Sequence, residues 1–270
     1  IWHLKDSDGY QGMSSIFSNS NYLGLWLNVL TPFSLIYLLE SYKNKWERLF
    51  YCFINFLIIL CTFLTFSRAA WLGLIISLFL ILKKKYFKYL IFTLLFITAV
   101  FLISFGNFPN DNIINLSREI IPEAIWNYKF KEINIFNLEN ILRLKIWFFA
   151  LKNILRQPLW GWGAGSFPIL FENYENIYFG HTHNLFLEIA INYGIPASIF
   201  FIIPLLFLMY KSIIIAYKDK SNLIINIYDK AWISSTFLIF IIQLYDVQYF
   251  DIRVSLIFWI LFAGTRNIVR

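Results

Sequence analysis

Long apolar segments recur along the chain and are separated by shorter polar ones. Seven apolar runs occur, at residues 23–39, 49–66, 69–82, 89–105, 185–209, 231–245 and 252–264. Lipid offers the backbone no hydrogen-bond partner, so each run is predicted to be a helix. A bilayer crossing needs about 17–25 residues, and four of the runs reach that length. The runs that begin at Ala69, Ala231 and Ile252 are shorter, and we expect them to be tilted, mismatched or shielded by neighbouring helices.

The composition supports a membrane location for these helices. Hydrophobic residues make up 59% of the 270 residues and charged residues only 14%, and the mean hydropathy is +0.62. A soluble domain has about 25% charged residues, so this chain has too few charges to cover a water-exposed surface. The sequence therefore predicts an all-α fold, a polytopic transmembrane helical bundle, and excludes a soluble domain.

The basic residues indicate the orientation of the helices. The net charge of +7 would also fit nucleic-acid binding, but the Lys and Arg residues gather after apolar runs, so we expect no nucleic-acid partner. When the crossings are counted, the basic groups at 43–48, 83–88, 211–230 and 266–270 fall on one side. The positive-inside rule places that side in the cytoplasm.

The opposite side then holds residues 1–22, the Ser67-Arg68 connection, and segments 106–182 and 246–251. Segment 106–182 is the only long hydrophilic one, and long loops in compact proteins usually carry function. Its part 139–155 is predicted to be an amphipathic helix.

We therefore expect three parts. Residues 1–105 would hold transmembrane helices behind an outer N-terminal segment, residues 106–182 an extracytoplasmic loop with amphipathic helices, and residues 183–270 the C-terminal transmembrane helices. The chain begins with Ile1 rather than Met, and we expect it to be a fragment that lacks earlier helices.

Arg68 is the first candidate for chemistry. Ser67 before it is a plausible N-cap, and a cation at a helix N-terminus opposes the helix dipole. An anion would offset this by using Arg68 together with the free backbone N–H groups. The alternative is an interfacial arginine that extends to the lipid headgroups. Arg143 is the second candidate and lies in the predicted amphipathic helix. The alternative to a functional role is that Arg143 forms an ion pair with Glu139 one turn earlier.

A glycine-rich segment follows at residues 158–167, with Gly161, Gly163 and Gly165 in alternate positions. It lacks a preceding strand and a Lys-Ser/Thr pair, so it is a poor nucleotide-binding loop. We expect a tight turn with positive φ angles.

Two histidines, His181 and His183, precede the fifth apolar run. A zinc site is one interpretation, with a third ligand from Glu172, Glu175 or Glu188, but no second metal motif supports it. Other interpretations are a histidine that caps the helix, or a base at the membrane surface, since histidine titrates near neutral pH. Glu188 lies about one turn into the run, where a carboxylate is costly without a partner.

Taken in order, these pieces resemble the O-antigen ligase and O-antigen polymerase family of bacterial membrane glycosyltransferases. The resemblance rests on residues 17–22, on Ser67-Arg68-Ala69-Ala70-Trp71, on residues 143–167, and on His183-Asn184 followed after nine residues by Gly194. The chain departs from the family pattern at Ser20, where the family tends to have Pro, and at Ala197, where it tends to have Gly, Thr or Tyr.

The resemblance implies transfer of a glycan from a polyprenyl-diphosphate carrier to an acceptor hydroxyl on a glycan, lipid or protein. It places the active site on the extracytoplasmic side of the bacterial plasma membrane, within lipopolysaccharide or polysaccharide biosynthesis. It also implies an enzyme that needs no metal or other cofactor, in which Arg68 and Arg143 hold the diphosphate and His183 activates the acceptor. We expect five further residues to contact substrate: Ser67, Gly163, Gly165, Asn184 and Glu188.

Two other functions compete with this one. A membrane transporter, for example of inorganic carbon, would bury polar groups near the midplane in broken helices, whereas the candidates here lie at the ends of runs. A non-catalytic membrane scaffold would need none of these residues.

Overall fold

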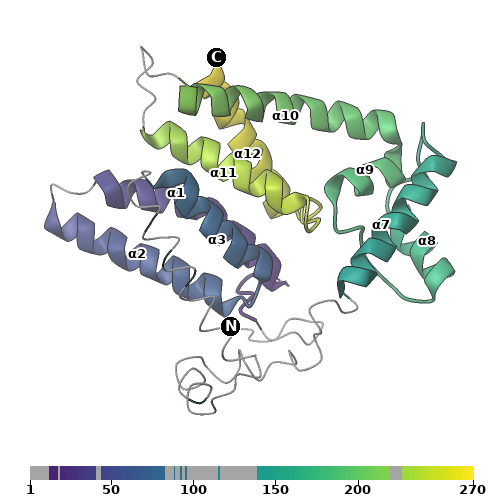
Figure 1. Ribbon diagram of the computed structural model, residues 1–270, viewed down its shortest axis with the longest axis horizontal. Coiled ribbons are helices and arrows are strands. Elements are labelled where there is room, and N and C mark those ends of the chain that lie inside the picture. The colour runs from purple at the N-terminus through teal and green to yellow at the C-terminus, as the bar shows by residue number, and fades with distance from the viewer. Residues whose placement is uncertain are drawn as a thin grey trace. The chain divides into compact units, whose positions relative to one another are not determined.

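The computed structural model describes residues 12–17, 19–40, 44–82, 139–218 and 227–270 of the protein, together with positions 88, 92, 95 and 115. Within these ranges, the side chains of 68, 139–142, 216–218 and 227 are not described. The structure is helical over this part of the chain, with nine helices and no strand among the residues described (Figure 1). The predicted all-α fold is confirmed.

The helices keep the order of the chain. They are α1 (Ser20–Glu40), α2 (Lys45–Leu64), α3 (Arg68–Ile81), α7 (Glu139–Arg156), α8 (Ser166–Glu175), α9 (Leu185–Tyr193), α10 (Ile195–Lys218), α11 (Ile227–Gln243) and α12 (Ile252–Val269). The amphipathic helix predicted over 139–155 is α7. The apolar run at 89–105, predicted to cross the membrane, and the loop residues 106–138 lie outside the described ranges apart from positions 92, 95 and 115.

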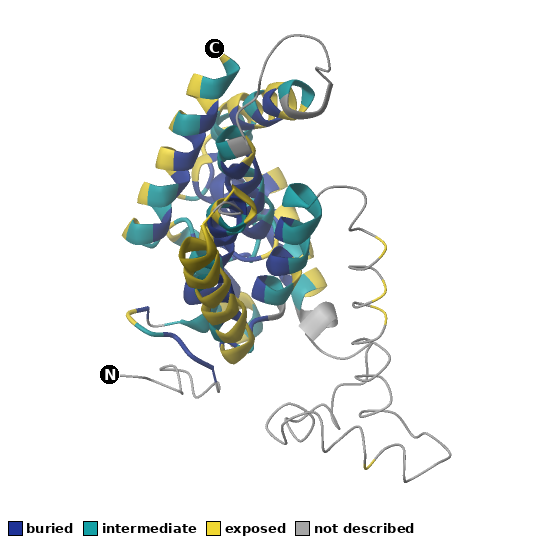
Figure 2. Cartoon of the chain, turned by 90° about the vertical axis from the view of Figure 1, so that its left-hand side faces the viewer, coloured by how far each residue is buried: buried dark blue, intermediate teal, exposed yellow. Residues whose placement is uncertain are grey.

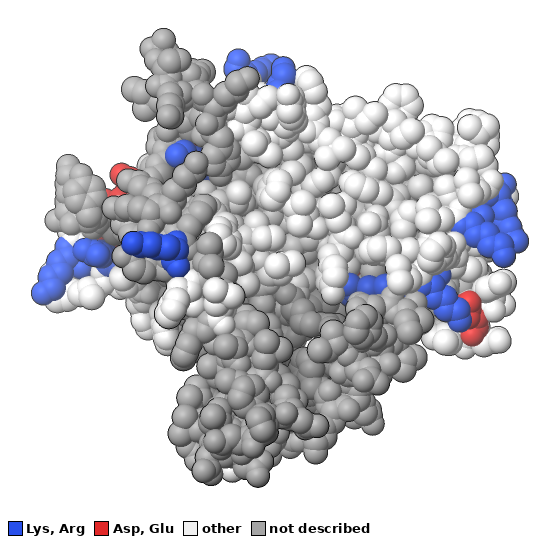
Figure 3. Space-filling view, in the orientation of Figure 1, with Lys and Arg blue, Asp and Glu red and all other residues white. Residues whose placement is uncertain are grey.

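Four described helices, α1, α2, α10 and α12, are long and apolar enough to cross a membrane. In α2 only 11% of the apolar window is buried, against 56% in α1, so α1 is central and α2 peripheral. Exposed side chains on α2 include Phe50, Phe53 and Phe56. The buried residues face the inside of the bundle in Figure 2, and the surface over the middle of the helices is almost free of charge in Figure 3. Such a surface suits lipid.

The core forms where α1 meets α11 and α12. Leu25 and Val29 of α1 lie in one buried cluster with Ile239 and Phe240 of α11 and Phe258 of α12. Several polar groups inside the bundle pair with one another or with the backbone. Ser34 Oγ lies 3.0 Å from Asn55 Oδ1 and links α1 to α2, and the hydroxyls of Thr236 and Thr265 lie 2.7 Å apart between α11 and α12. These bonds avoid the cost of an unpaired polar group in an apolar interior.

Two predictions about the apolar runs are corrected. The run at 185–209 is not one crossing, because the chain turns at Gly194, where φ is 90°, and divides into α9 and α10. Nine residues are too few for α9 to span a bilayer. The run at 252–264 gives a longer helix than predicted, since α12 continues to Val269.

The chain forms two compact units, residues 1–81 with 146–270, and residues 82–145. The predicted division after residues 105 and 182 stays a prediction. In the first unit, three connections meet at one end of the bundle. Met13 N donates to the carbonyl of Leu64 at the end of α2, and both Asn21 and His183 contact Asp246 between α11 and α12.

Candidate active site

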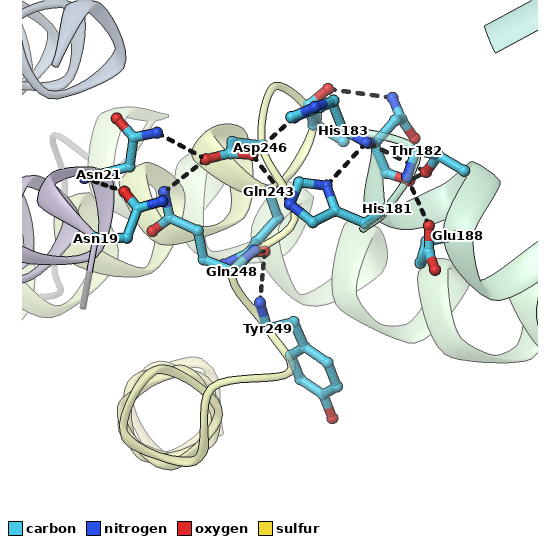
Figure 4. Close-up of polar contacts among 12 residues, drawn as sticks. Asn19, Asn21, His181, Thr182, His183, Glu188, Gln243, Asp246, Gln248 and Tyr249 are labelled. Atoms are coloured by element: carbon cyan, nitrogen blue, oxygen red, sulfur yellow. Dashed lines mark hydrogen bonds and ion pairs between the residues drawn. The ribbon is translucent and has the colours of Figure 1, made fainter. Parts of the chain in front are cut away.

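A histidine and an aspartate from distant connections form the centre of the site. His183 Nδ1 lies 3.0 Å from Asp246 Oδ1 (Figure 4). The Asp246 side chain is 8% exposed and the His183 side chain 23%. An ionised carboxylate can only accept hydrogen bonds, so Nδ1 of a neutral His183 carries the proton and Nε2 keeps its lone pair. The imidazole can therefore accept a proton at Nε2.

Two amides hold the other oxygen of the carboxylate. Asn21 Nδ2 and Gln248 Nε2 each lie 3.2 Å from Asp246 Oδ2. Burial acts to raise the pKa of Asp246, but the hydrogen bond from His183, the nearby histidines and the Gln248 amide outweigh it, and the pKa lies below its ordinary value. Asp246 is thus an anion at neutral pH despite its burial.

The second histidine lies on the same carboxylate. His181 Nε2 is 3.8 Å from Asp246 Oδ1, and the ring centroids of His181 and His183 are 4.3 Å apart. The backbone N–H of His183 donates to His181 Nδ1 at 3.2 Å. Because Nδ1 accepts this bond, the proton of a neutral His181 lies on Nε2 and faces Asp246.

A metal could find three ligand atoms here, since donor atoms of His181, His183 and Asp246 lie within 4.8 Å of one another. None of the predicted third ligands, Glu172, Glu175 and Glu188, is among them. A metal could bind Nε2 of His181 only through the lone pair of that nitrogen. In this hydrogen-bonding pattern Nε2 carries a proton, so the lone pair is not available. The geometry therefore favours proton chemistry over metal binding.

A buried glutamate fixes the backbone next to His183. Glu188 is 3% exposed, and its oxygens accept from Thr182 N at 2.8 Å and from Asn192 Nδ2 at 3.0 Å. Burial raises the pKa of Glu188, and the bonds from Thr182 and Asn192 oppose that rise. His183 itself has a φ of 55°, a conformation that non-glycine residues seldom adopt. Strain of this kind persists only where neighbouring contacts hold it.

Helix α9 gives a physical meaning to the spacing of His183, Asn184 and Gly194. Asn184 is the N-cap, and its Oδ1 accepts from the backbone of Phe186 at 3.0 Å and Leu187 at 3.2 Å. Gly194 ends the helix with φ 90°, and a Cβ there would collide with the carbonyl of Leu159. The nine residues between Asn184 and Gly194 are α9 itself.

The sequence profile of the O-antigen ligase family matches residues 53–202, more than half of the chain. The chain belongs to the O-antigen ligase family. The match includes Arg68, Arg143, the glycine-rich turn and His183. A search of curated proteins found no match. Family membership and the four apolar helices together support a multi-pass membrane protein of the ligase type of glycosyltransferase.

In this O-antigen ligase family protein, Ser67 has the predicted capping role. Its Oγ accepts from the backbone N–H of Ala70 at 3.3 Å at the start of α3. The α2–α3 turn lies close to α1, because a Cβ on Gly24 would lie 3.7 Å from Ser67 Cβ. Arg68 follows Ser67 at that turn, but its side chain lies outside the described ones. Its contact with a diphosphate stays a prediction.

Arg143 is half-buried in α7. It belongs to the unit of residues 82–145, whereas His183 belongs to the other unit. The convergence of Arg143 and Arg68 on one donor therefore stays a prediction.

The glycine-rich segment forms the predicted turn, with positive φ angles at Gly161, Gly163 and Gly165. Its backbone binds the end of α9, since Trp162 N donates to Ile191 O and Gly163 N to Asn192 O, both at 2.9 Å. A substrate-binding role for Gly163, Gly165, Asn184 or Glu188 stays a prediction. The amide of Asn184 and the carboxylate of Glu188 already bond to the protein.

Sequence reasoning missed Asp246, Asn21 and Gln248 as members of this site. The predicted topology had placed segment 246–251 on the same side of the membrane as His183. That shared side was the one signal that Asp246 could belong to the site. No local spacing connects Asp246 to a histidine 63 positions earlier. Asn21 was noted only as part of the family pattern.

Proposed function

We propose that the protein is a glycosyltransferase that moves a glycan from a polyprenyl-diphosphate carrier to an acceptor hydroxyl on the outer face of the bacterial plasma membrane. The observation that carries this proposal is the 3.0 Å contact of His183 Nδ1 with the buried carboxylate of Asp246. A hydroxyl is a weak nucleophile, and a fixed imidazole that accepts at Nε2 is a suitable general base.

The reaction follows from these groups. The acceptor oxygen attacks the anomeric carbon of the donor sugar, and the bond from that carbon to the phosphate oxygen breaks. His183 Nε2 takes the proton of the hydroxyl, and Asp246 stabilises the resulting imidazolium. The bonding electrons leave with the polyprenyl diphosphate, and the proton on His183 is later lost to solvent.

Charge on the leaving diphosphate needs stabilisation, and Arg68 and Arg143 would supply it. A guanidinium binds two phosphate oxygens at once and keeps its charge. With two such groups the reaction needs no metal, since the leaving group is already a good one.

A transfer assay tests the proposal directly. Purified protein in lipid nanodiscs is given a polyprenyl-diphosphate glycan and an acceptor, and product is measured for the wild type, for His183→Ala and for Asp246→Asn, with and without EDTA. Transfer that depends on both side chains and survives EDTA is the expected result. Transfer lost in EDTA and restored by zinc would instead support a metal at His181, His183 and Asp246. Full transfer in both variants would overturn the proposed mechanism.

Labelling of introduced cysteines tests the side of the membrane. Asn176, the exposed C-cap residue of α8, is changed to Cys in a chain whose Cys52 and Cys61 are replaced. We expect an impermeant thiol reagent to label it in intact cells. Glu47→Cys is the matched control. Glu47 lies in the first turn of α2, at the end predicted to be cytoplasmic, and should be labelled only after lysis. The reverse pattern would contradict the orientation.

A further inference from the structure

Residues 12–17, called the arm here, contact the end of α2 and the start of α12. Met13 N donates to Leu64 O at 2.8 Å at the end of α2. Met13 is 3% exposed and Phe17 6%, and both belong to a buried cluster with Leu23 of α1. The arm is therefore packed on the bundle through apolar side chains as well as through its backbone.

Arg253, at the start of α12, holds the arm from the other side. Its Nη1 donates to Ile16 O at 2.9 Å, and its guanidinium carbon lies 4.4 Å from the ring centroid of Phe17. The same guanidinium donates to both oxygens of Asp251, at 3.1 and 2.6 Å. A planar fork can make all of these contacts at once.

Asp251 in turn is fixed by the helix that Arg253 belongs to. Its Oδ1 accepts from the backbone of Arg253 at 2.9 Å and of Val254 at 3.4 Å, as the N-cap of α12. The hydrogen bond from Arg253 holds the pKa of Asp251 below its ordinary value. The position of the guanidinium therefore follows from the folded end of α12.

The first turn of α1, which follows the arm, brings an amide to the catalytic pair. Asn21 N donates to Asn19 Oδ1 at 2.8 Å, and Asn21 Nδ2 lies 3.2 Å from Asp246 Oδ2 (Figure 4). First turns of helices fray readily when nothing holds them. The arm precedes this turn, and its Phe17 packs against Leu23 of the same helix.

We propose that Asn21 is a positioning residue for the His183–Asp246 pair, and that Arg253 keeps Asn21 in place by binding Ile16 and Phe17. The proposal rests on the proposed function. An amide on Oδ2 sets the rotation of the carboxylate, so that Oδ1 faces His183 Nδ1. The amide also stabilises the negative charge without titrating itself.

Loss of this amide changes the chemistry in a definite direction. With one donor fewer, the buried carboxylate attracts the proton of the pair more strongly and can rotate away from Nδ1. We expect kcat to fall by about three- to tenfold, the worth of one hydrogen bond, and the acidic limb of the kcat/KM profile to move to higher pH. A residue with only a structural role would lower the amount of folded protein without moving that limb.

The variants are Asn21→Leu, which removes the donor at similar size, Arg253→Ala, which removes the contact with the arm, and Arg253→Lys. An ammonium cannot bind Ile16 O and both Asp251 oxygens in one plane, so Arg253→Lys should fall between wild type and Arg253→Ala. Arg266→Ala, an exposed arginine near the other end of the same helix, is the matched control and should retain wild-type kcat and pH profile.

Transfer is measured across pH for each variant, with thermal unfolding in detergent as a check of folding. If Asn21→Leu is not recovered as folded protein, Asn21→Ser, whose hydroxyl is too short to reach Asp246, gives the same readout. A shifted acidic limb in the Asn21 variant and in Arg253→Ala supports the proposal. The proposal would be overturned if folded Asn21→Leu kept the wild-type kcat and an unshifted acidic limb. In that case the proposed function would still stand, provided that His183→Ala lost transfer. Full transfer in His183→Ala would instead overturn the proposed function.

Discussion

His183 and Asp246 lie 3.0 Å apart although 63 positions separate them, and each lies in a connection between helices. A second bond joins the same two connections, because Asn184 Nδ2 donates to Leu244 O at 3.1 Å. Asn184 is also the N-cap of α9. The residue that starts α9 therefore fixes the distance between the segment that holds His183 and the one that holds Asp246.

Asp246→Asn should lower turnover by roughly 10²–10⁴-fold, the usual worth of a correctly protonated general base. An amide could donate to Nδ1 and place the proton of His183 on Nε2, where the base is needed. The measurement is transfer from a purified polyprenyl-diphosphate glycan at saturating donor. Glu47→Gln, which removes an exposed carboxylate at the other end of the bundle, should leave turnover unchanged. Wild-type turnover in Asp246→Asn would remove the aspartate from the mechanism.

The two histidines should differ in their effect. His183→Ala removes the base and should cost roughly 10²–10⁴-fold in turnover, whereas donor binding persists. His181→Ala should cost much less, because neither nitrogen of His181 is available as a base. Its Nδ1 accepts the backbone N–H of His183, and its Nε2 carries the proton and lies 3.8 Å from Asp246. Equal losses in the two variants would indicate a shared metal or structural role, and a fully active His183→Ala would make Glu188 the next candidate for the base.

Stability should depend on pH through Asp246 in a direction set by its lowered pKa. A carboxyl group whose pKa is lowered by folding stabilises the fold above its unfolded pKa of about 3.9, and this contribution is lost as the pH falls through the folded pKa. The difference in unfolding temperature between wild type and Asp246→Asn should therefore not narrow between about pH 7 and pH 5. It should narrow below about pH 4. Narrowing near pH 6 would mean that Asp246 titrates there.

The helices could be predicted because the bilayer leaves the backbone few alternatives. The runs that became α1, α2, α3 and α11 agree in position with the structure, and α12 begins with its run but extends beyond it. The division of the fifth run could not be predicted from hydropathy, since α9 and α10 are both apolar. It depends on Gly194 and its approach to the Leu159 carbonyl, which is a tertiary contact.

The candidate site was predictable where it is local. Ser67 was identified as a cap and the glycine segment as a turn. The interpretation of a histidine as the cap of the fifth run is wrong, since the cap of α9 is Asn184. Asp246, Asn21 and Gln248 enter through contacts between distant segments, and a single sequence carries no signal of such pairing. Their residue types are also common at helix ends, so the pattern around them favours no particular role.

Gly194→Ala should destabilise the protein strongly. Alanine is strained at a φ of 90°, at a cost of about 1–3 kcal/mol, and its Cβ would collide with the Leu159 carbonyl. Gly180→Ala is the matched control, because a Cβ there has no atom within 4 Å and φ is not in the left-handed region. Unfolding temperature in detergent should fall for Gly194→Ala only. Equal stability of the two variants would show that the turn between α9 and α10 is not fixed by this glycine.

Arg68 and Arg143 are predicted to meet on one diphosphate. Arg68→Lys should impair transfer because an ammonium lacks the planar fork that binds two phosphate oxygens. Arg68→Ala and Arg143→Ala should each weaken donor binding, and the two losses should not add if both residues grip the same group. Affinity for a polyprenyl-diphosphate glycan and turnover are measured for the single and double variants. Arg156→Ala, also in α7, is the control for loss of a positive charge from that helix. Normal donor affinity and turnover in both single variants would leave the diphosphate without its predicted partners, and the leaving group would then need a different cation.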